Sequence, residues 1–152
     1  MTESGHSAGQ SGPIAETKRS NPKDAIGCVK PPLSVIPCAP LFEAGLALLE
    51  GSCKYGRHNY REAGVRASIY YDASMRHLMA WWEGEDIDAD SGLSHVTKAI
   101  AGLLVLRDSM MSGNWHDDRP PKSAPWMETM KAKAREILAR FPDPLPPYTE
   151  VS

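Results

Sequence analysis

The chain has 152 residues, of which 24% are charged, with a formal net charge of −2 and a pI near 6.2. This length predicts one folded domain, and the balanced charge gives no overall attraction to nucleic acid, so no nucleic-acid partner is expected. No apolar run approaches the roughly 20 residues that span a bilayer, and the polar N-terminus lacks the pattern of a signal peptide. We therefore expect no membrane partner and a cytoplasmic protein.

Composition divides the chain into three parts. Residues 1–30 are rich in Ser, Gly, Thr and Lys and hold few large apolar side chains, which predicts a flexible N-terminal tail. Residues 31–141 are expected to form one all-α domain, which begins with an extended Pro-containing arm up to Pro40. Residues 142–152 hold four prolines and predict a tail that cannot be helical.

Apolar side chains at helical spacing predict the first helix over residues 40–56. Its core face is expected to carry Leu41, Leu48 and Leu49. A loop is expected over residues 57–66.

Two further helices are predicted on either side of a short connection. The first runs from Ser68, which can cap it, to about Glu83, and the second is capped by Ser91 or Ser94 and ends near Met111. The core stripe of the first is expected to be Tyr71, Met75, Leu78 and Trp82. That of the second is expected to be Ala99, Leu103, Leu106 and Met110. The short connection predicts that the two helices run antiparallel.

In the remainder of the domain, the sequence predicts a loop over residues 112–124 and a last amphipathic helix over residues 125–141. No segment has a strand period of convincing length. The sequence therefore predicts an all-α fold.

The connection between the second and third predicted helices is strongly acidic. It holds five carboxylates within eight residues: Glu83, Glu85, Asp86, Asp88 and Asp90. These charges repel one another, and a bound cation such as Mg²⁺ or Mn²⁺, which takes oxygen ligands, would remove the repulsion. Glu85 and Asp88 can aim at one point if the segment continues a helical turn. A solvated acidic loop is the alternative.

The spacing of Asp86, Asp88 and Asp90 resembles the opening of an EF-hand calcium loop. Such a loop needs Gly at the next position and Glu at the twelfth, where this chain has Ser91 and Thr97. The sequence therefore excludes an EF-hand.

Three basic or titratable side chains accompany the acidic connection. His95 falls in the first turn of the third predicted helix, where it can ligate a metal, bond a phosphate or cap the helix. Lys98, one turn further on, would add a cation to such an anion site, and its alternative is an exposed helix lysine. His77 lies in the middle of the second predicted helix and is as consistent with a core histidine as with a catalytic one.

Residues 54–61 combine four potential cations with two aromatic side chains. Such a segment suits the phosphates of a nucleotide, with Tyr or Asn available to stack on the base or hydrogen-bond it. A basic surface loop and an RNA-binding patch remain open as alternatives. Because the chain has no Walker P-loop, nucleotide handling would depend on metal ions and basic side chains.

Six sequence runs between residues 38 and 121 stand in the order of one known family. They are Lys54-Tyr-Gly-Arg-His-Asn-Tyr-Arg, Gly64-Val-Arg-Ala-Ser, Tyr71-Asp-Ala-Ser-Met-Arg-His-Leu, Trp81-Trp-Glu-Gly-Glu-Asp-Ile-Asp, Ser91-Gly-Leu-Ser-His and Asp117-Asp-Arg-Pro-Pro. Together they resemble the phage dATP/dGTP diphosphohydrolase family, whose best-known member is MazZ.

The resemblance implies a MazG-like antiparallel bundle of four to five helices, completed by oligomerisation as a dimer or tetramer. It also implies cleavage of a nucleoside triphosphate between its α and β phosphates, with two or three Mg²⁺ or Mn²⁺ ions held by carboxylates. Glu85 and Asp88 have the spacing of the superfamily's Glu-x-x-Asp motif, but no clean Glu-Glu-x-x-Glu precedes them. The residues that compete for the missing motif are Glu43, Glu50, Asp72 and Glu83.

Three sets of site residues follow from this resemblance. The metal ligands are expected among Glu50, Asp72, Glu83, Glu85 and Asp88, with Asp86 as a further candidate. The catalytic residues are expected to be Glu85, Asp88 and His95. The side chains that contact the substrate are expected to be Lys54, Arg57, Asn59, Arg61, Arg76 and Lys98.

The function implied by the resemblance is conversion of dGTP, and also of GTP or dATP, to the nucleoside monophosphate and pyrophosphate. In a phage this reaction would feed the synthesis of 2-aminoadenine nucleotides in the host cytoplasm. Two alternatives from other classes remain open. One is a helical module that binds nucleotides or RNA without turnover, and the other is a structural helical protein whose acidic connection is solvated.

Overall fold

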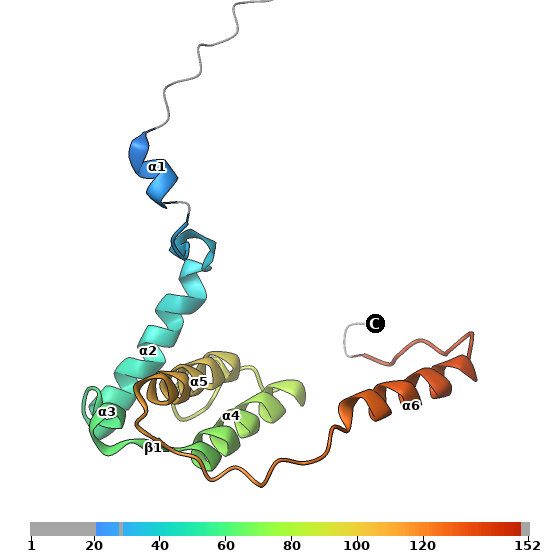
Figure 1. The fold of residues 1–152 in the computed structure, drawn as a ribbon. Coiled ribbons are helices and arrows are strands. Elements are labelled where there is room, and N and C mark those ends of the chain that lie inside the picture. The colour runs from blue at the N-terminus through green and yellow to red at the C-terminus, as the bar shows by residue number, and fades with distance from the viewer. Residues whose placement is uncertain (1–20, 28, 150–152) are drawn as a thin grey trace, which may run out of the picture. The chain divides into compact units, whose positions relative to one another are not determined.

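The computed structural model describes residues 21–27 and 29–149 (Figure 1). Within these residues the chain is mostly helical, and its two strands are only two residues long, which confirms the predicted all-α class. The chain divides into two compact units, residues 1–41 and residues 42–152.

The described part of the first unit holds a short helix, α1 (Pro22–Gly27), and a 3-10 turn, η1 (Leu33–Val35). Asn21 helps to start α1, because its side-chain oxygen accepts a hydrogen bond of 3.0 Å from the backbone N–H two residues further on. α1 lies in the segment predicted to be a flexible tail. Residues 1–20 and 28 of that segment lie outside the described residues.

The second unit contains most of α2, four more helices and two short strands. Their bounds are α2 (Cys38–Tyr55), α3 (Asn59–Ala63), β1 (Val65–Arg66), α4 (Ala67–Trp82), α5 (His95–Ser112), β2 (Trp115–His116) and α6 (Met127–Ala139). The four helices predicted from apolar periodicity are confirmed as α2, α4, α5 and α6, with their ends shifted by a few residues.

Both predicted loops, residues 57–66 and residues 112–124, contain regular structure, so these predictions are wrong. α3 and β1 lie in the first loop, and β2 lies in the second. β1 and β2 pair in parallel, with Val65 opposite Trp115. Two-residue strands are too short for a sequence period to reveal them. Their pairing ties the start of α4 to the end of α5.

α4 and α5 pack side by side in the second unit (Figure 1). His77 of α4 contacts His95 at the start of α5, whereas Ser74 lies close to Gly102 further along it, so the helices are antiparallel as predicted. The approach is close, because a Cβ atom at Gly102 would lie only 3.3 Å from Ser74 Oγ. Small residues on both helices therefore set their separation.

The predicted core stripes are largely wrong for this chain taken by itself. Tyr71 and Trp82 of α4 are 61% and 77% exposed, and Leu41 and Leu49 of α2 and Leu103 of α5 are also exposed. The side chains that are buried are small or polar: Ala44, Ala47, Val65, Ala67, Ser74, His95, Thr97, Ala99, Ala101, Val105 and Ser109. The helices thus meet through their small-residue faces, and large apolar side chains face outward.

The starts of the two central helices are capped differently. The side chain of Ser94 accepts a hydrogen bond from the backbone N–H of Val96, which confirms one of the two predicted caps of α5. Ser68 is not the cap of α4. Instead, Asp118 accepts a hydrogen bond of 2.9 Å from the backbone N–H of Ser68 and one of 2.5 Å from its hydroxyl. The loop after β2 therefore supplies this cap.

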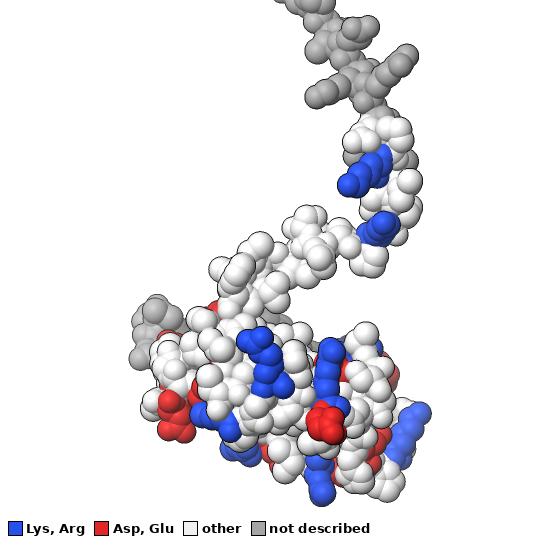
Figure 2. All heavy atoms as spheres, turned by 90° about the vertical axis from the view of Figure 1, so that its left-hand side faces the viewer, with Lys and Arg blue, Asp and Glu red and all other residues white. Residues whose placement is uncertain are grey.

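Charged side chains of both signs are interspersed on the face drawn in Figure 2, with no broad basic area among them. None of the helices in the described residues combines the length and the apolar character needed to cross a membrane.

Candidate metal centre and nucleotide cavity

The acidic connection between α4 and α5 is a loop and does not continue a helical turn, which was the condition for Glu85 and Asp88 to aim at one point. Gly84 leaves α4 with a φ of 97°, in the left-handed region that favours glycine. The loop then folds back on itself. The N–H of Asp88 donates to the carbonyl of Leu93 at 2.9 Å, and the N–H of His95 donates to the carbonyl of Asp86 at 3.0 Å. These bonds bring Asp88 to the first turn of α5.

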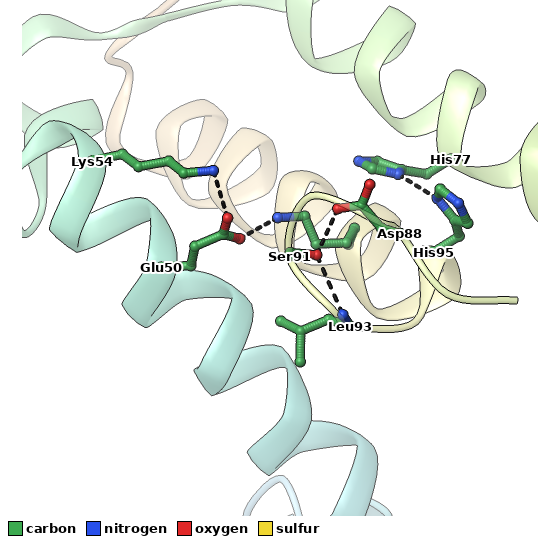
Figure 3. Close-up of polar contacts among 8 residues, drawn as sticks. Glu50, Lys54, His77, Asp88, Ser91, Leu93 and His95 are labelled. Atoms are coloured by element: carbon green, nitrogen blue, oxygen red, sulfur yellow. Dashed lines mark hydrogen bonds and ion pairs between the residues drawn. The ribbon is translucent and has the colours of Figure 1, made fainter.

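Three side chains from three different segments converge at this point (Figure 3). His77 comes from the middle of α4, Asp88 from the loop and His95 from the start of α5. One potential ligand atom from each lies within 4.8 Å of the other two. The Nδ1 atoms of the two histidines are 2.8 Å apart, so one ring donates a hydrogen bond to the other, in a direction set by their tautomers.

The second ring nitrogen of His95, Nε2, lies on the side of Glu85 in the acidic loop. His95 is only 6% exposed, and its Nε2 atom is buried without a hydrogen-bond partner among the described residues. The nearest carboxylate oxygen is Oε1 of Glu85, at 3.6 Å, which is too long for a strong hydrogen bond. A buried polar atom without a partner is costly and calls for an explanation such as a ligand or ion.

The protonation states of the cluster suit a cation. The hydrogen bond of 2.5 Å from the Ser91 hydroxyl lowers the pKa of the Asp88 carboxyl, and the positive charge of Lys98 lowers it further, against the opposing effect of burial. Burial lowers the pKa of His77, although the Asp88 carboxylate partly offsets this. The cluster therefore holds an ionised carboxylate beside a neutral imidazole, the forms that bind metals.

Glu50 of α2 lies next to this cluster, with Lys54 beside it (Figure 3). Its carboxylate accepts a hydrogen bond of 2.5 Å from Lys54 and a second hydrogen bond from Lys98 of α5. Both bonds lower the pKa of Glu50. Lys98 is largely buried, with 18% of its side chain exposed, so an ammonium group is held close to the centre.

A cavity of about 600 Å³ adjoins the cluster, bounded by α2, the α2–α3 loop, α3, α4 and α5. His77 and Lys98 line it, so the cavity and the cluster share a wall. Arg57 and Asn59, which the sequence predicts as substrate contacts, also line it. The volume falls in the usual range for small-molecule sites, roughly 300–1,000 Å³.

Residues 20–119 match the protein family described as dATP/dGTP diphosphohydrolase, N-terminal. The chain belongs to this family. The match includes every residue of the cluster and of the cavity described above.

A protein named dATP/dGTP diphosphohydrolase from Salmonella phage PMBT28 is 32% identical to this member of the family over 90 residues. That segment covers 59% of this chain but only 30% of the phage protein. No solved structure matches the chain.

The structure distributes the predicted metal ligands unevenly around the centre. Asp88 lies in the cluster, Glu85 lies at its edge, and Glu50 lies beside it in ion pairs with lysines. Asp72 and Glu83 are exposed and lie outside the cluster. The carboxylates are therefore spread over a wider region than a single ion needs.

Some of the predicted phosphate-binding side chains lie near the centre, and others lie away from it. Lys54 and Lys98 share Glu50, whereas Arg61 forms a bidentate ion pair with Asp108 of α5, with bonds of 2.7 and 2.9 Å. Arg76 is exposed on α4 and does not line the cavity.

His77 is the cluster member that sequence reasoning left undecided. A single histidine within a helix has no signal of its own, because its partner lies 18 residues further on. The sequence feature that could have indicated His77 is the presence of a histidine on each side of a short acidic connection between two antiparallel helices. Each faces the other only because of the rotation of α4 about its axis, which the sequence does not fix.

The donor set of this centre fits a divalent metal. Two imidazoles and a carboxylate form the set, with one imidazole nitrogen buried and unpartnered. Imidazole ligands suit transition metals better than Mg²⁺, which prefers oxygen. His77, Asp88 and His95 would hold the ion, with Glu85 as a neighbouring carboxylate.

Proposed function

We propose that the chain is a metal-dependent hydrolase that converts a purine nucleoside triphosphate to the nucleoside monophosphate and pyrophosphate, with dGTP as its main substrate and GTP and dATP as further ones. The observation that carries the proposal is the convergence of His77, Asp88 and His95 beside a cavity of nucleotide size. The family assignment and the name of the phage relative support the same chemistry.

A divalent ion held by the cluster would place positive charge beside the triphosphate. This charge would stabilise the negative charge that develops on the phosphate oxygens in the transition state. Lys98 would bind phosphate oxygens, because its ammonium group lies at both the cluster and the cavity. Lys54 can exchange Glu50 for a phosphate oxygen in the same way, since half of its side chain is exposed. Arg57 and Asn59 remain predicted contacts on the cavity wall.

Glu85 is the proposed general base. Its carboxylate lies 3.6 Å from His95 Nε2, and 58% of its side chain is exposed, so water reaches it. It would take a proton from the water whose oxygen bonds to the α-phosphorus. The bond from that phosphorus to the bridging oxygen then breaks, and pyrophosphate leaves with the bridging oxygen. One water is consumed for each nucleoside monophosphate released.

The decisive experiment is to incubate the full chain with dGTP and Mn²⁺ in ¹⁸O-labelled water. We expect dGMP and pyrophosphate, with the label in dGMP because the water attacks the α-phosphorus. His77→Ala should lose turnover, whereas His116→Ala should keep it, because His116 is exposed on β2, beyond the opposite end of α5. Release of inorganic phosphate instead of pyrophosphate would contradict the proposal. Saturable binding of dGTP without any product would favour the non-catalytic module.

Mn²⁺ is the proposed metal in preference to Mg²⁺, because two of the three donors are imidazoles. The described cluster accounts for one ion, and the two or three ions implied by the resemblance would require the surrounding carboxylates. Turnover measured with each metal after dialysis against a chelator tests this choice. Higher kcat/KM with Mg²⁺ than with Mn²⁺ would show that oxygen ligands dominate.

The proposed cellular role is the supply of dGMP for 2-aminoadenine nucleotide synthesis in a phage. This role requires that guanine be preferred over adenine. A kcat/KM for dATP that exceeds that for dGTP would exclude the role and leave the hydrolase activity in place.

A further inference from the structure

The cavity beside the metal centre is lined by a buried hydroxyl group that pairs with no other described residue. Ser74 of α4 is 5% exposed and lines the cavity, and its hydroxyl has no hydrogen-bond partner among the described residues. An unpaired buried hydroxyl costs free energy that an alanine would not. A ligand in the cavity would give this hydroxyl a partner.

Aromatic side chains surround the same space. Tyr55, Tyr60 and Tyr70 all line the cavity, from the end of α2, from α3 and from α4. Burial raises the pKa of the Tyr70 hydroxyl, and Tyr55 and Tyr60 raise it further. Aromatic rings that face a cavity offer a surface on which a nucleobase can stack.

Glycines keep the cavity open. Gly51 of α2 and Gly102 of α5 both line it. A Cβ atom at Gly51 would meet nothing within 4 Å, so a side chain there has room to enter the cavity. The free volume on this side of α2 is therefore a consequence of the missing side chain and is not needed for helix packing.

We propose that this cavity is the nucleoside subsite, in which the tyrosines flank the base and the Ser74 hydroxyl hydrogen-bonds the nucleoside. The subsite deepens the proposed function and rests on it, because the shared residues His77 and Lys98 would join the nucleoside to phosphates at the metal centre. Its residues come from four helices of the second unit and the loop between α2 and α3, so the subsite requires the assembled fold.

Calorimetric titration of the full chain with dGMP, at saturating Mn²⁺, tests the subsite. Ser74→Ala removes one neutral hydrogen bond and should weaken dGMP binding roughly three- to tenfold. Because the hydroxyl is unpaired in the free protein, the same variant should melt at the same temperature as the natural chain or higher. Ser109→Ala is the matched control, since the Ser109 hydroxyl is also buried without a partner among the described residues but does not line the cavity.

A second variant fills the cavity. Gly51→Phe should weaken dGMP binding at least tenfold and leave Mn²⁺ affinity unchanged, because Gly51 lies outside the metal cluster. Ala132→Phe, at an exposed position of α6, adds the same bulk outside the cavity and should bind dGMP normally. Far-UV circular dichroism verifies that each variant is folded.

Wild-type failure to bind dGMP, or unchanged dGMP affinity in folded Gly51→Phe, would overturn the subsite. The two proposals fail in distinguishable ways. If the chain releases pyrophosphate and Gly51→Phe keeps the wild-type KM, the subsite is wrong and the hydrolase stands. If the chain turns over no triphosphate but the variants weaken dGMP binding as expected, the hydrolase is wrong and the subsite stands.

Discussion

A short contact with Ser91 helps to position the carboxylate of Asp88. The Ser91 hydroxyl donates to Asp88 Oδ2 at 2.5 Å, and the N–H of Leu93 in turn donates to Ser91 Oγ at 3.3 Å (Figure 3). Side chains that orient a metal ligand in this way commonly affect metal affinity by 10- to 100-fold. Ser91 is therefore a positioning residue for the proposed ion.

Ser91→Ala should weaken Mn²⁺ binding by roughly tenfold, because the Asp88 carboxylate loses the bond that orients it. Isothermal titration with Mn²⁺ measures this effect. Ser112→Ala serves as the control, since its hydroxyl donates only to the Asp108 carbonyl at the far end of α5. Wild-type Mn²⁺ affinity in Ser91→Ala would mean that Asp88 does not bind the ion.

Glu85→Gln should abolish pyrophosphate release and preserve the fold, because the amide cannot accept the proton of the attacking water. Glu85 lies at the edge of the cluster and outside its three converging donors, so Mn²⁺ binding should persist. A single-turnover assay with dGTP and a Mn²⁺ titration separate the two properties. Retention of most of the activity would remove Glu85 from the proposed base position.

At the scale of elements, the contact between Asp118 and Ser68 joins the loop after β2 to the start of α4. The hydrogen bonds from the hydroxyl and the backbone N–H of Ser68 lower the pKa of Asp118 in the folded chain. A carboxyl whose pKa is lower in the folded than in the unfolded chain stabilises the fold fully above its unfolded pKa, about 3.9. The contribution disappears as the pH falls through the folded pKa.

Asp118→Ala should therefore lower the melting temperature at pH 7, and the difference from the natural chain should shrink as the pH falls from about 5 toward 3. Thermal melts monitored by circular dichroism test both parts. Asp117→Ala is the neighbouring control, because the contacts of Asp117 are exposed and local, an ion pair and a backbone hydrogen bond with Arg119, and should matter little. A difference that stays constant over this pH range would show that the carboxylate charge does not stabilise α4.

At the scale of the whole molecule, large apolar side chains are exposed on α6 and on the outer face of α4. Tyr71, Met75, Leu78 and Trp82 are exposed on α4, and α6 has no buried residue. The buried hydrophobic residues of the described chain are only alanines and valines. Soluble monomers rarely expose apolar surface on this scale, so we expect the chain to complete its core by assembling with copies of itself.

Light scattering coupled to size exclusion should give a mass of two or four times the 16.6 kDa of the chain. The double variant Met75→Asp with Leu78→Asp should reduce this mass, because it places charges on the outer face of α4. Arg135→Asp, a charge change at an exposed residue of α6, should not. A natural chain of 16.6 kDa in solution would contradict the expected oligomer.

The sequence by itself determined the local features. The period of apolar residues located α2, α4, α5 and α6, the serines before α5 narrowed its cap to Ser91 or Ser94, and the acidic run located the loop that supplies Asp88. Each of these depends on residues within one or two helical turns of one another, where spacing along the chain dictates spacing in the fold.

Only the tertiary structure decided which faces and which distant residues meet. It paired His77 with His95, gave α4 its cap from Asp118 50 residues away, and buried small residues where the periodicity predicted large ones. The physical reason is that a helical period gives the spacing of a stripe but not the neighbour it faces. That choice depends on how closely two helices approach, and here Ser74 and Gly102 set the approach.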